Sequence, residues 1–220
     1  MKISRLGRHP RRERVRIYVD GADRPRSELA LDLVLGAGLS VGAELTEARL
    51  RALEREDEAY RARDAALSLL AHRARSREEL RRRLDRKDFA PPVIASTLEW
   101  LDERGYVDDR DFAETFVRDR LRLRPRGRIR LVQELRKKGV DAGTAEAAVA
   151  AVMEREGIDE AALARTAADA WARKNRSVLR KAAGSRDGRL RARRRLYGHL
   201  ARRGFTPDAV RAAVSAALDD

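Results

Sequence analysis

The stretch LVQELRKKGV (residues 131–140) decides the fold, because its pattern occurs at two other places in the chain. LRRRLDRKDF (80–89) and LYGHLARRGF (196–205) also place two leucines four residues apart, followed by a basic residue, a Gly or Asp, and an apolar residue. Leucines four residues apart share one face of a helix, and a left-handed Gly commonly follows a helix end. The chain is therefore predicted to contain an internal repeat in three copies.

Helix boundaries between these stretches complete each repeat. Ser76 and Glu79 form a capping box, in which each side chain can satisfy a backbone N–H at the start of a helix. Further helix starts are predicted at Pro91, Asp108, Asp141, Asp159 and Pro207, and further helix ends at Gly105 and Gly157. Each repeat then holds three helices, and the repeats span 46–106, 107–157 and 158–220. We expect an elongated and curved molecule of nine helices, because each repeat contacts mainly its neighbours.

Residues 1–45 differ from the repeats and are predicted to form a basic tail followed by a small β-hairpin. Apolar residues alternate with polar ones over 15–19 and again over 28–32, with an Asp-Gly turn signal after the first run. Two strands alone are marginally stable, so the hairpin must pack on another element. A charge-rich helix is predicted next, over 46–72, and it can break near Glu56.

The segment 173–191 is predicted to be a polar linker within the third repeat. It is rich in basic residues and contains Gly184, Ser185 and Gly188, which favour irregular structure. Such a segment is either an arm that becomes ordered on a partner or a long loop.

The chain of 220 residues carries a net charge of +14, and the excess is concentrated in three segments. Residues 1–16, 117–140 and 173–203 together hold +26, so the rest of the chain sums to −12. The codon bias of a GC-rich genome explains a preference for arginine over lysine, but it does not explain the clustering. Concentrated basic segments on an otherwise acidic chain are typical of proteins that bind a polyanion, usually nucleic acid.

The sequence holds no pattern typical of an enzyme, a metal site or a cofactor site. Without cysteine there is no disulfide, no thiolate nucleophile and no Cys-ligated metal. The three histidines lie far apart, and neither a P-loop nor a dinucleotide-binding loop is present. The acids at Asp108, Asp109 and Asp111 could be imagined as a metal cluster, but helix capping accounts for them better. With neither a signal peptide nor a membrane span, we expect a soluble cytoplasmic protein without catalytic residues.

Alternating arginines over residues 118–130 are the strongest functional signal. Around Pro125 and Gly127 the chain is predicted to be a loop, so several guanidinium groups can converge on one phosphate or carboxylate surface. The alternative is a solvated face of a basic protein. Aromatic residues do not interleave with these arginines, and Tyr106 and Tyr197 are predicted to lie in the core instead. A phosphate backbone or an acidic protein surface is therefore the expected target, without base-specific recognition.

Three motifs in order resemble the RecX family of RecA regulators. They are RARSREEL (73–80), LEWLDERGYVDDRDFA (98–113) and RIRLVQELRKKGV (128–140). The resemblance covers residues 60–155 best, and the chain departs from the family pattern at Asp88, where Gly is usual, and in a longer basic segment over 175–189.

The resemblance implies an all-helical protein that binds in the groove of the RecA–DNA filament and inhibits ATP hydrolysis, strand exchange and coprotease activity. Its implied partners are the RecA recombinase filament and single- and double-stranded DNA without sequence preference, and we expect a monomer. A stand-alone DNA-binding protein that competes for DNA is the alternative. The residues predicted to contact the filament or DNA are Arg73, Arg75, Arg118, Arg120, Arg122, Arg124, Arg126, Arg128, Arg130, Lys137, Lys138, Arg191, Arg193 and Arg194.

Overall fold

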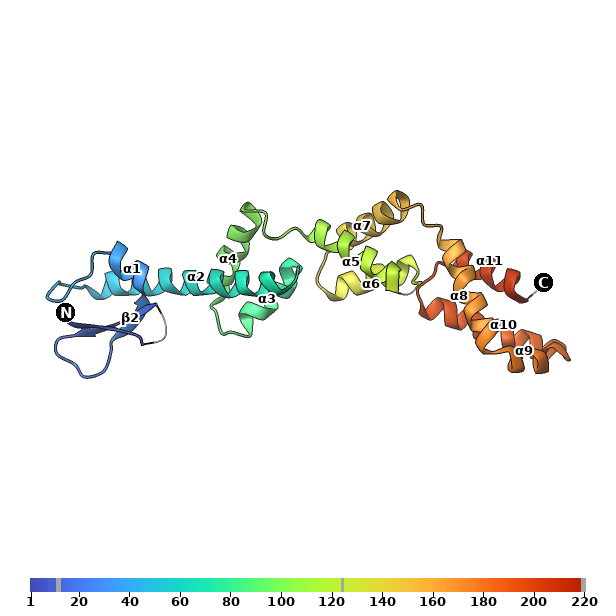
Figure 1. The fold of residues 1–220 in the computed structure, drawn as a ribbon, viewed down its shortest axis with the longest axis horizontal. Helices are drawn as coiled ribbons and strands as arrows, with labels where there is room; N and C mark the ends of the chain where they lie inside the picture. Colours follow the sequence, from blue (N-terminus) through green and yellow to red (C-terminus); the bar gives the residue numbers. More distant parts are fainter. Residues whose placement is uncertain (11–12, 124, 219–220) are drawn as a thin grey trace. The chain divides into compact units, whose positions relative to one another are not determined.

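The structure is a computed structural model that describes residues 1–10, 13–123 and 125–218. These residues contain eleven helices and three strands, which confirms a mainly helical fold with a small N-terminal sheet (Figure 1). The chain divides into two compact units. The N-terminal unit contains Met1–Arg73 and Leu80–Arg104, and the C-terminal unit contains Ala74–Glu79 and the chain from Gly105 onward.

The predicted basic tail is a strand of the N-terminal sheet. Strands β1 (Ile3–Arg8), β2 (Arg14–Val19) and β3 (Ser27–Ala30) form an antiparallel sheet in the order β1-β2-β3. The hairpin prediction missed β1, because basic residues on its exposed side conceal the buried Ile3. The third strand also ends earlier than predicted, since Leu31 starts helix α1 (Leu31–Gly36).

Helix α2 (Glu47–His72) is continuous, so the break expected near Glu56 is absent from it. The Thr46 hydroxyl caps this helix by accepting a hydrogen bond from the backbone N–H of Arg49. Leu50 and Leu53 lie on its buried face and pack with apolar side chains of the sheet. Burial of both leucines holds the first half of α2 on the sheet.

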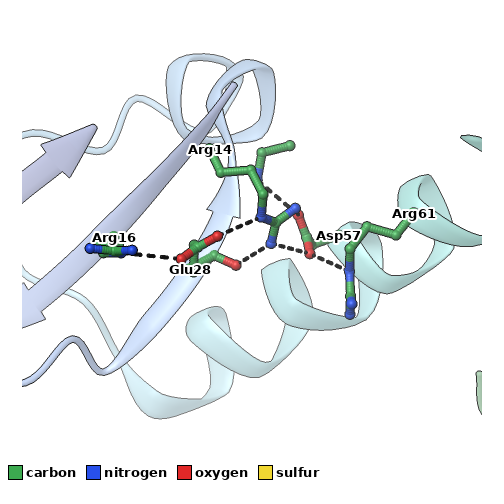
Figure 2. Close-up of polar contacts among 6 residues, drawn as sticks. Arg14, Arg16, Glu28, Asp57 and Arg61 are labelled. Atoms are coloured by element: carbon green, nitrogen blue, oxygen red, sulfur yellow. Dashed lines mark hydrogen bonds and ion pairs between the residues drawn. The ribbon is translucent and has the colours of Figure 1, made fainter. Parts of the chain in front are cut away.

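A buried ion cluster also joins the sheet to α2 (Figure 2). Asp57, which is 2% exposed, accepts two hydrogen bonds from the Arg14 guanidinium, at 3.1 and 2.9 Å. It also accepts one from Arg61 at 3.0 Å and one from the backbone N–H of Ala30 at 2.8 Å. Burial disfavours the charged form of Arg14, but hydrogen bonds and charge from Asp57 and Glu28 outweigh it and raise the pKa of Arg14.

Two shorter helices follow α2. Ser76 precedes α3 (Arg77–Asp85), and its hydroxyl accepts a hydrogen bond from the Glu79 N–H at 3.1 Å, as the capping box predicts. Helix α4 (Pro91–Glu103) begins at the predicted proline and buries Ile94, Leu98 and Leu101. The segment between these helices reverses the chain at Asp88, which adopts a left-handed backbone with φ 61°.

The second repeat consists of α5 (Asp109–Leu123), α6 (Arg128–Lys137) and α7 (Ala142–Arg155). Its core contains Leu131 and Leu135 of the repeated pattern, packed with Phe112, Val149 and other apolar side chains. Asp108 caps α5, because its carboxylate accepts hydrogen bonds from the N–H groups of residues 110 and 111. Among the described residues, no group of acids or histidines is arranged to hold a metal ion.

The third repeat consists of α8 (Glu160–Lys174), α10 (Arg186–Arg202) and α11 (Pro207–Leu218), with α9 (Arg176–Ala183) inserted after α8. The prediction of a linker over 173–191 is therefore wrong. Ser185 and Gly188 start a helix instead of forming irregular structure. The Ser185 hydroxyl caps α10 by accepting a hydrogen bond from the Gly188 N–H. A Cβ at Gly188 would lie 2.4 Å from the carbonyl oxygen of Ala182, so this glycine allows α9 and α10 to approach closely.

The repeated helix ends share one geometry. Gly139 and Gly204 have φ of 88° and 75°, which corresponds to the left-handed conformation of Asp88. The N–H of the residue that follows donates to the carbonyl of the second leucine in the pattern. These pairs are Phe89 to Leu84, Val140 to Leu135 and Phe205 to Leu200. This is the Schellman arrangement that the repeated sequence predicts. The aromatic residues Tyr106 and Tyr197, in contrast, are 53% and 41% exposed rather than buried in a core.

Candidate functional site

Many of the arginines predicted to contact a partner form ion pairs with glutamates of the same chain. Glu134, on α6, pairs with Arg120 at 3.4 Å, with Arg130 at 2.8 Å and with Arg126. The alternating arginines therefore converge on an acid of their own repeat. The spacing from Arg130 to Glu134 is the one signal for this cluster in the sequence, since residues four apart meet on a helix.

A second acid, Glu114 on α5, lies at the centre of another arginine group. It is 8% exposed and pairs with Arg118 at 2.9 Å, with Arg155 at 2.8 Å and with Arg110 at 3.5 Å. The hydrogen bond from Arg155 is the main cause of a lowered pKa of Glu114. Arg110 and Arg118 lie four residues from Glu114, so their pairs follow from helix spacing, but the pair with Arg155 does not, because Arg155 is distant in the chain.

Acid should remove the stability that Glu114 contributes. A carboxyl whose pKa is lower in the folded chain stabilises the fold above its ordinary pKa, and the contribution is lost as the pH falls through the lowered value. Glu114→Gln should therefore lower stability at neutral pH and reduce the loss between about pH 5 and pH 2. Urea unfolding across this range measures both effects. Glu154→Gln, at an exposed acid on α7, should keep the full acid dependence, and an unchanged pH slope in Glu114→Gln would contradict the assignment.

Lys138 lies in a junction between the start of α3 and the end of α6. Its ammonium group pairs with Glu79 at 3.0 Å, and its carbonyl accepts a hydrogen bond from the Ser76 hydroxyl. The backbone N–H of Arg77 donates to Asp109 at 2.8 Å, which gives the second acid of the Asp108-Asp109 pair a structural partner. Ser76 therefore both caps α3 and binds the end of α6.

The start of α6 forms the corresponding junction with the end of α10. The N–H groups of Gly127 and Ile129 donate to the carbonyls of Arg203 and Gly204, each at 3.0 Å. Glu160, at the first position of α8, accepts from the Arg128 N–H at 2.8 Å, as Asp109 accepts from Arg77. The two junctions thus use equivalent positions of successive repeats, and several basic residues help to hold them.

The remaining predicted residues lie at the surface, on separate elements. Arg122 near the end of α5, Lys137 at the end of α6, and Arg191, Arg193 and Arg194 on α10 are exposed. Arg73 is exposed just after α2, and Arg75 is half-buried before α3. Arg124 lies outside the described residues.

Comparison with known proteins agrees with this repeat architecture. A family model described as "RecX, first three-helix domain" matches residues 62–101, and one described as "RecX, second three-helix domain" matches residues 108–149. A relative from Halorhodospira halophila, named "Regulatory protein RecX", is 40% identical over 158 residues, which cover 72% of this chain and 89% of that protein. The chain belongs to the RecX family.

Other RecX proteins extend the similarity. The "Regulatory protein RecX" of Corynebacterium efficiens is 37% identical over 171 residues, which cover 76% of this chain and 78% of that protein. A structure titled "Crystal structure of regulatory protein RecX" covers 96% of this chain and 98% of its own, with a TM-score of 0.70 and 22% identity. A structure titled "Crystal structure of RecX from Lactobacillus salivarius" covers 74% of this chain and 97% of its own, with a TM-score of 0.61 and 22% identity. These structures share the fold, and the named relatives identify the chain as a RecX-family regulator.

The junctions explain why this RecX chain tolerates Asp88 where two later repeats have glycine. A Cβ at Gly139 would lie 2.2 Å from the Cβ of Glu78, and one at Gly204 would lie 2.3 Å from the backbone nitrogen of Arg130. Both positions therefore need glycine for close approach as well as for their backbone conformation. Asp88 is exposed, so only the left-handed conformation constrains it, and Asp tolerates that conformation better than most residues.

None of the described helices is long and apolar enough to cross a membrane.

Proposed function

We propose that this chain regulates the RecA recombinase by binding in the groove of the RecA–DNA filament and inhibiting ATP hydrolysis, strand exchange and coprotease activity. The observation that carries the proposal is the match to both RecX three-helix domains, together with relatives named as RecX regulators. The protein would act by binding, with no catalytic residue of its own.

Exposed basic residues on three helices of the C-terminal unit support a polyanionic target. Arg122 and Arg136 lie in the second repeat and Arg191 lies on α10, and all three are exposed. Arg118, Arg120, Arg126 and Arg130 pair with Glu114 or Glu134 instead. We propose that the exposed set makes the filament contacts, because a contact made by a paired arginine would first have to break an internal ion pair.

Reversing the charge of Arg122, Arg136 and Arg191 to glutamate should weaken filament binding at least tenfold, or about 1.4 kcal/mol. Helical content should not change, since all three side chains are exposed at the surface of their helices. Cosedimentation with RecA filaments measures binding, and circular dichroism measures the fold. The matched control reverses Arg8, Arg24 and Arg55, which are exposed in the N-terminal unit. Equal binding by both variants would contradict the proposed surface.

The alternative, a stand-alone DNA-binding protein, is separated by a salt series. Cosedimentation with DNA alone should then be as strong as with the filament and should fall steeply as salt rises, because phosphate contacts release counterions. RecA without DNA would not retain the protein in that case. A RecA filament regulator should bind the filament more tightly than the same DNA without RecA at every salt concentration.

A further inference from the structure

A groove of about 510 Å³ lies between α10 and α11 in the third repeat. Leu190, Tyr197 and Val214 supply its apolar lining. Leu190 and Tyr197 remain 47% and 41% exposed, although both are large side chains on a helix whose opposite face is buried. A volume of this size lies within the range of pockets that hold ligand groups.

The rim of this groove is basic. Arg193, Arg194 and Arg211 line it, and among its described lining residues the charged ones are all arginines. Arg193 donates to the Ser215 hydroxyl at 3.4 Å, and Arg211 pairs with Asp208 on the preceding turn of α11. The α10 side of the groove lies in the segment 173–203, whose net charge of +12 attracts acidic partners.

We propose that this groove binds an acidic peptide segment of a partner protein, with one large apolar side chain against Leu190 and Tyr197 and flanking carboxylates on the arginines. An apolar floor contributes little to binding a sugar–phosphate backbone, which stays hydrated, but it favours a peptide whose apolar side chain it removes from water. Arginine pairs with carboxylates in a two-pronged geometry that suits the rim. Tyrosine and arginine, which this groove combines, are also enriched in the hot spots of protein interfaces.

The proposal is independent of the filament contacts, because Arg122, Arg136 and Arg191 do not line the groove. Charge reversal of Arg122 and Arg136 alone, which lie on α5 and α6, should therefore leave peptide binding unchanged. Failure of one proposal leaves the other standing.

Fluorescence anisotropy with synthetic peptides tests the groove in the full chain. The probe is a fluorescein-labelled peptide of glutamate, aspartate and serine around one central phenylalanine, and its partner peptide has alanine in place of the phenylalanine. The phenylalanine peptide should bind about tenfold more tightly, which corresponds to about 1.4 kcal/mol. Leu190→Ser with Tyr197→Ser should remove this difference, while Leu123→Ser, at a leucine that is 72% exposed on α5, should preserve it.

The charged rim has its own variant. Arg194→Glu should weaken both peptides, and Arg24→Glu, at an exposed arginine in the N-terminal unit, should weaken neither. Circular dichroism shows whether each variant is folded. Absence of peptide binding, or binding that survives the loss of Leu190 and Tyr197, would overturn the proposal. A labelled single-stranded oligonucleotide that displaces the peptide and is lost in the same double variant would also overturn it, in favour of a nucleobase in the groove.

Discussion

Replacing Asp57 by alanine should lower the free energy of unfolding of the N-terminal unit by about 3–5 kcal/mol. The carboxylate accepts hydrogen bonds from Arg14, from Arg61 and from the backbone of Ala30 (Figure 2). Its loss would leave the Arg14 guanidinium, whose side chain is 16% exposed, beside an apolar methyl group and without its main partner. Breaking a buried pair on one side is costly because the other charge stays buried.

Glu28 would moderate this loss without preventing it. It pairs with Arg14 at 3.0 Å, and the carbonyl of Glu28 accepts a second hydrogen bond from the same guanidinium. Burial opposes the charged form of Glu28, but hydrogen bonds from Arg16 and Arg14 outweigh it and lower the pKa of Glu28. Arg14 would therefore remain charged in the variant. The backbone N–H of Ala30 would have lost its acceptor, and β3 would lose its hydrogen bond to the Asp57 side chain of α2.

Unfolding in urea, followed by tryptophan fluorescence, measures the effect in the right unit. The chain has two tryptophans, and Trp171→Phe leaves Trp100 on α4 as the reporter of the N-terminal unit. Asp57→Asn, which keeps one acceptor oxygen, should lose less than Asp57→Ala. Asp64→Ala is the matched control, because this exposed acid lies two turns later on the same helix, and it should change stability by about 0.5 kcal/mol or less. Equal losses for Asp57→Ala and Asp64→Ala would contradict a stabilising ion cluster.

The helices of the repeats could be predicted because their signals are local. Asp108, Asp141 and Asp159 cap the helices that they precede, and each satisfies N–H groups within three residues of itself. The left-handed turns at Gly139 and Gly204 likewise depend on a few neighbouring residues. These helix starts and ends can therefore be predicted without knowledge of the rest of the fold.

Strand β1 and helix α9 could not be predicted because they depend on distant partners. The strand is stable only where β2 pairs with it. The Arg5 guanidinium carbon also lies 3.8 Å from the centre of the Tyr18 ring on β2, a contact that cannot be predicted from the sequence. The sequence alone favours irregular structure at Gly188, since glycine is common in loops. Glycine also allows two helices to approach closely, and only the position of Ala182 decides between the two roles.

The candidate surface shows the same division. Alternating arginines were recognised from their spacing, but Glu114 and Glu134 neutralise several of them. The pair between Arg155 and Glu114 joins α7 to α5, so it could not be read from the spacing of either helix. Arg14 was counted in a basic tail for the same reason, although Asp57 binds it. A count of basic residues therefore overstates the charge that a RecA filament or DNA could meet.

Replacing Gly204 by alanine should lower the stability of the C-terminal unit by about 2–4 kcal/mol, from about 1 for the left-handed backbone and about 1–3 for the added contact. The new Cβ would lie 2.3 Å from the backbone nitrogen of Arg130. Backbone atoms on the facing segment cannot rotate away as a side chain can. The two N–H to carbonyl hydrogen bonds at this junction would have to lengthen or break.

Gly157→Ala separates the two causes. Gly157 also has a left-handed backbone, with φ 61°, but a Cβ there would meet nothing within 4 Å, so its loss should be about 1 kcal/mol. Urea unfolding in a Trp100→Phe background, with Trp171 on α8 as the reporter, compares both variants within one unit. A larger loss for Gly204→Ala isolates the close approach of α6 to α10. Equal losses would mean that the junction yields to a methyl group at no cost, so that Gly204 would be required for its backbone conformation alone, as Asp88 is in the first repeat.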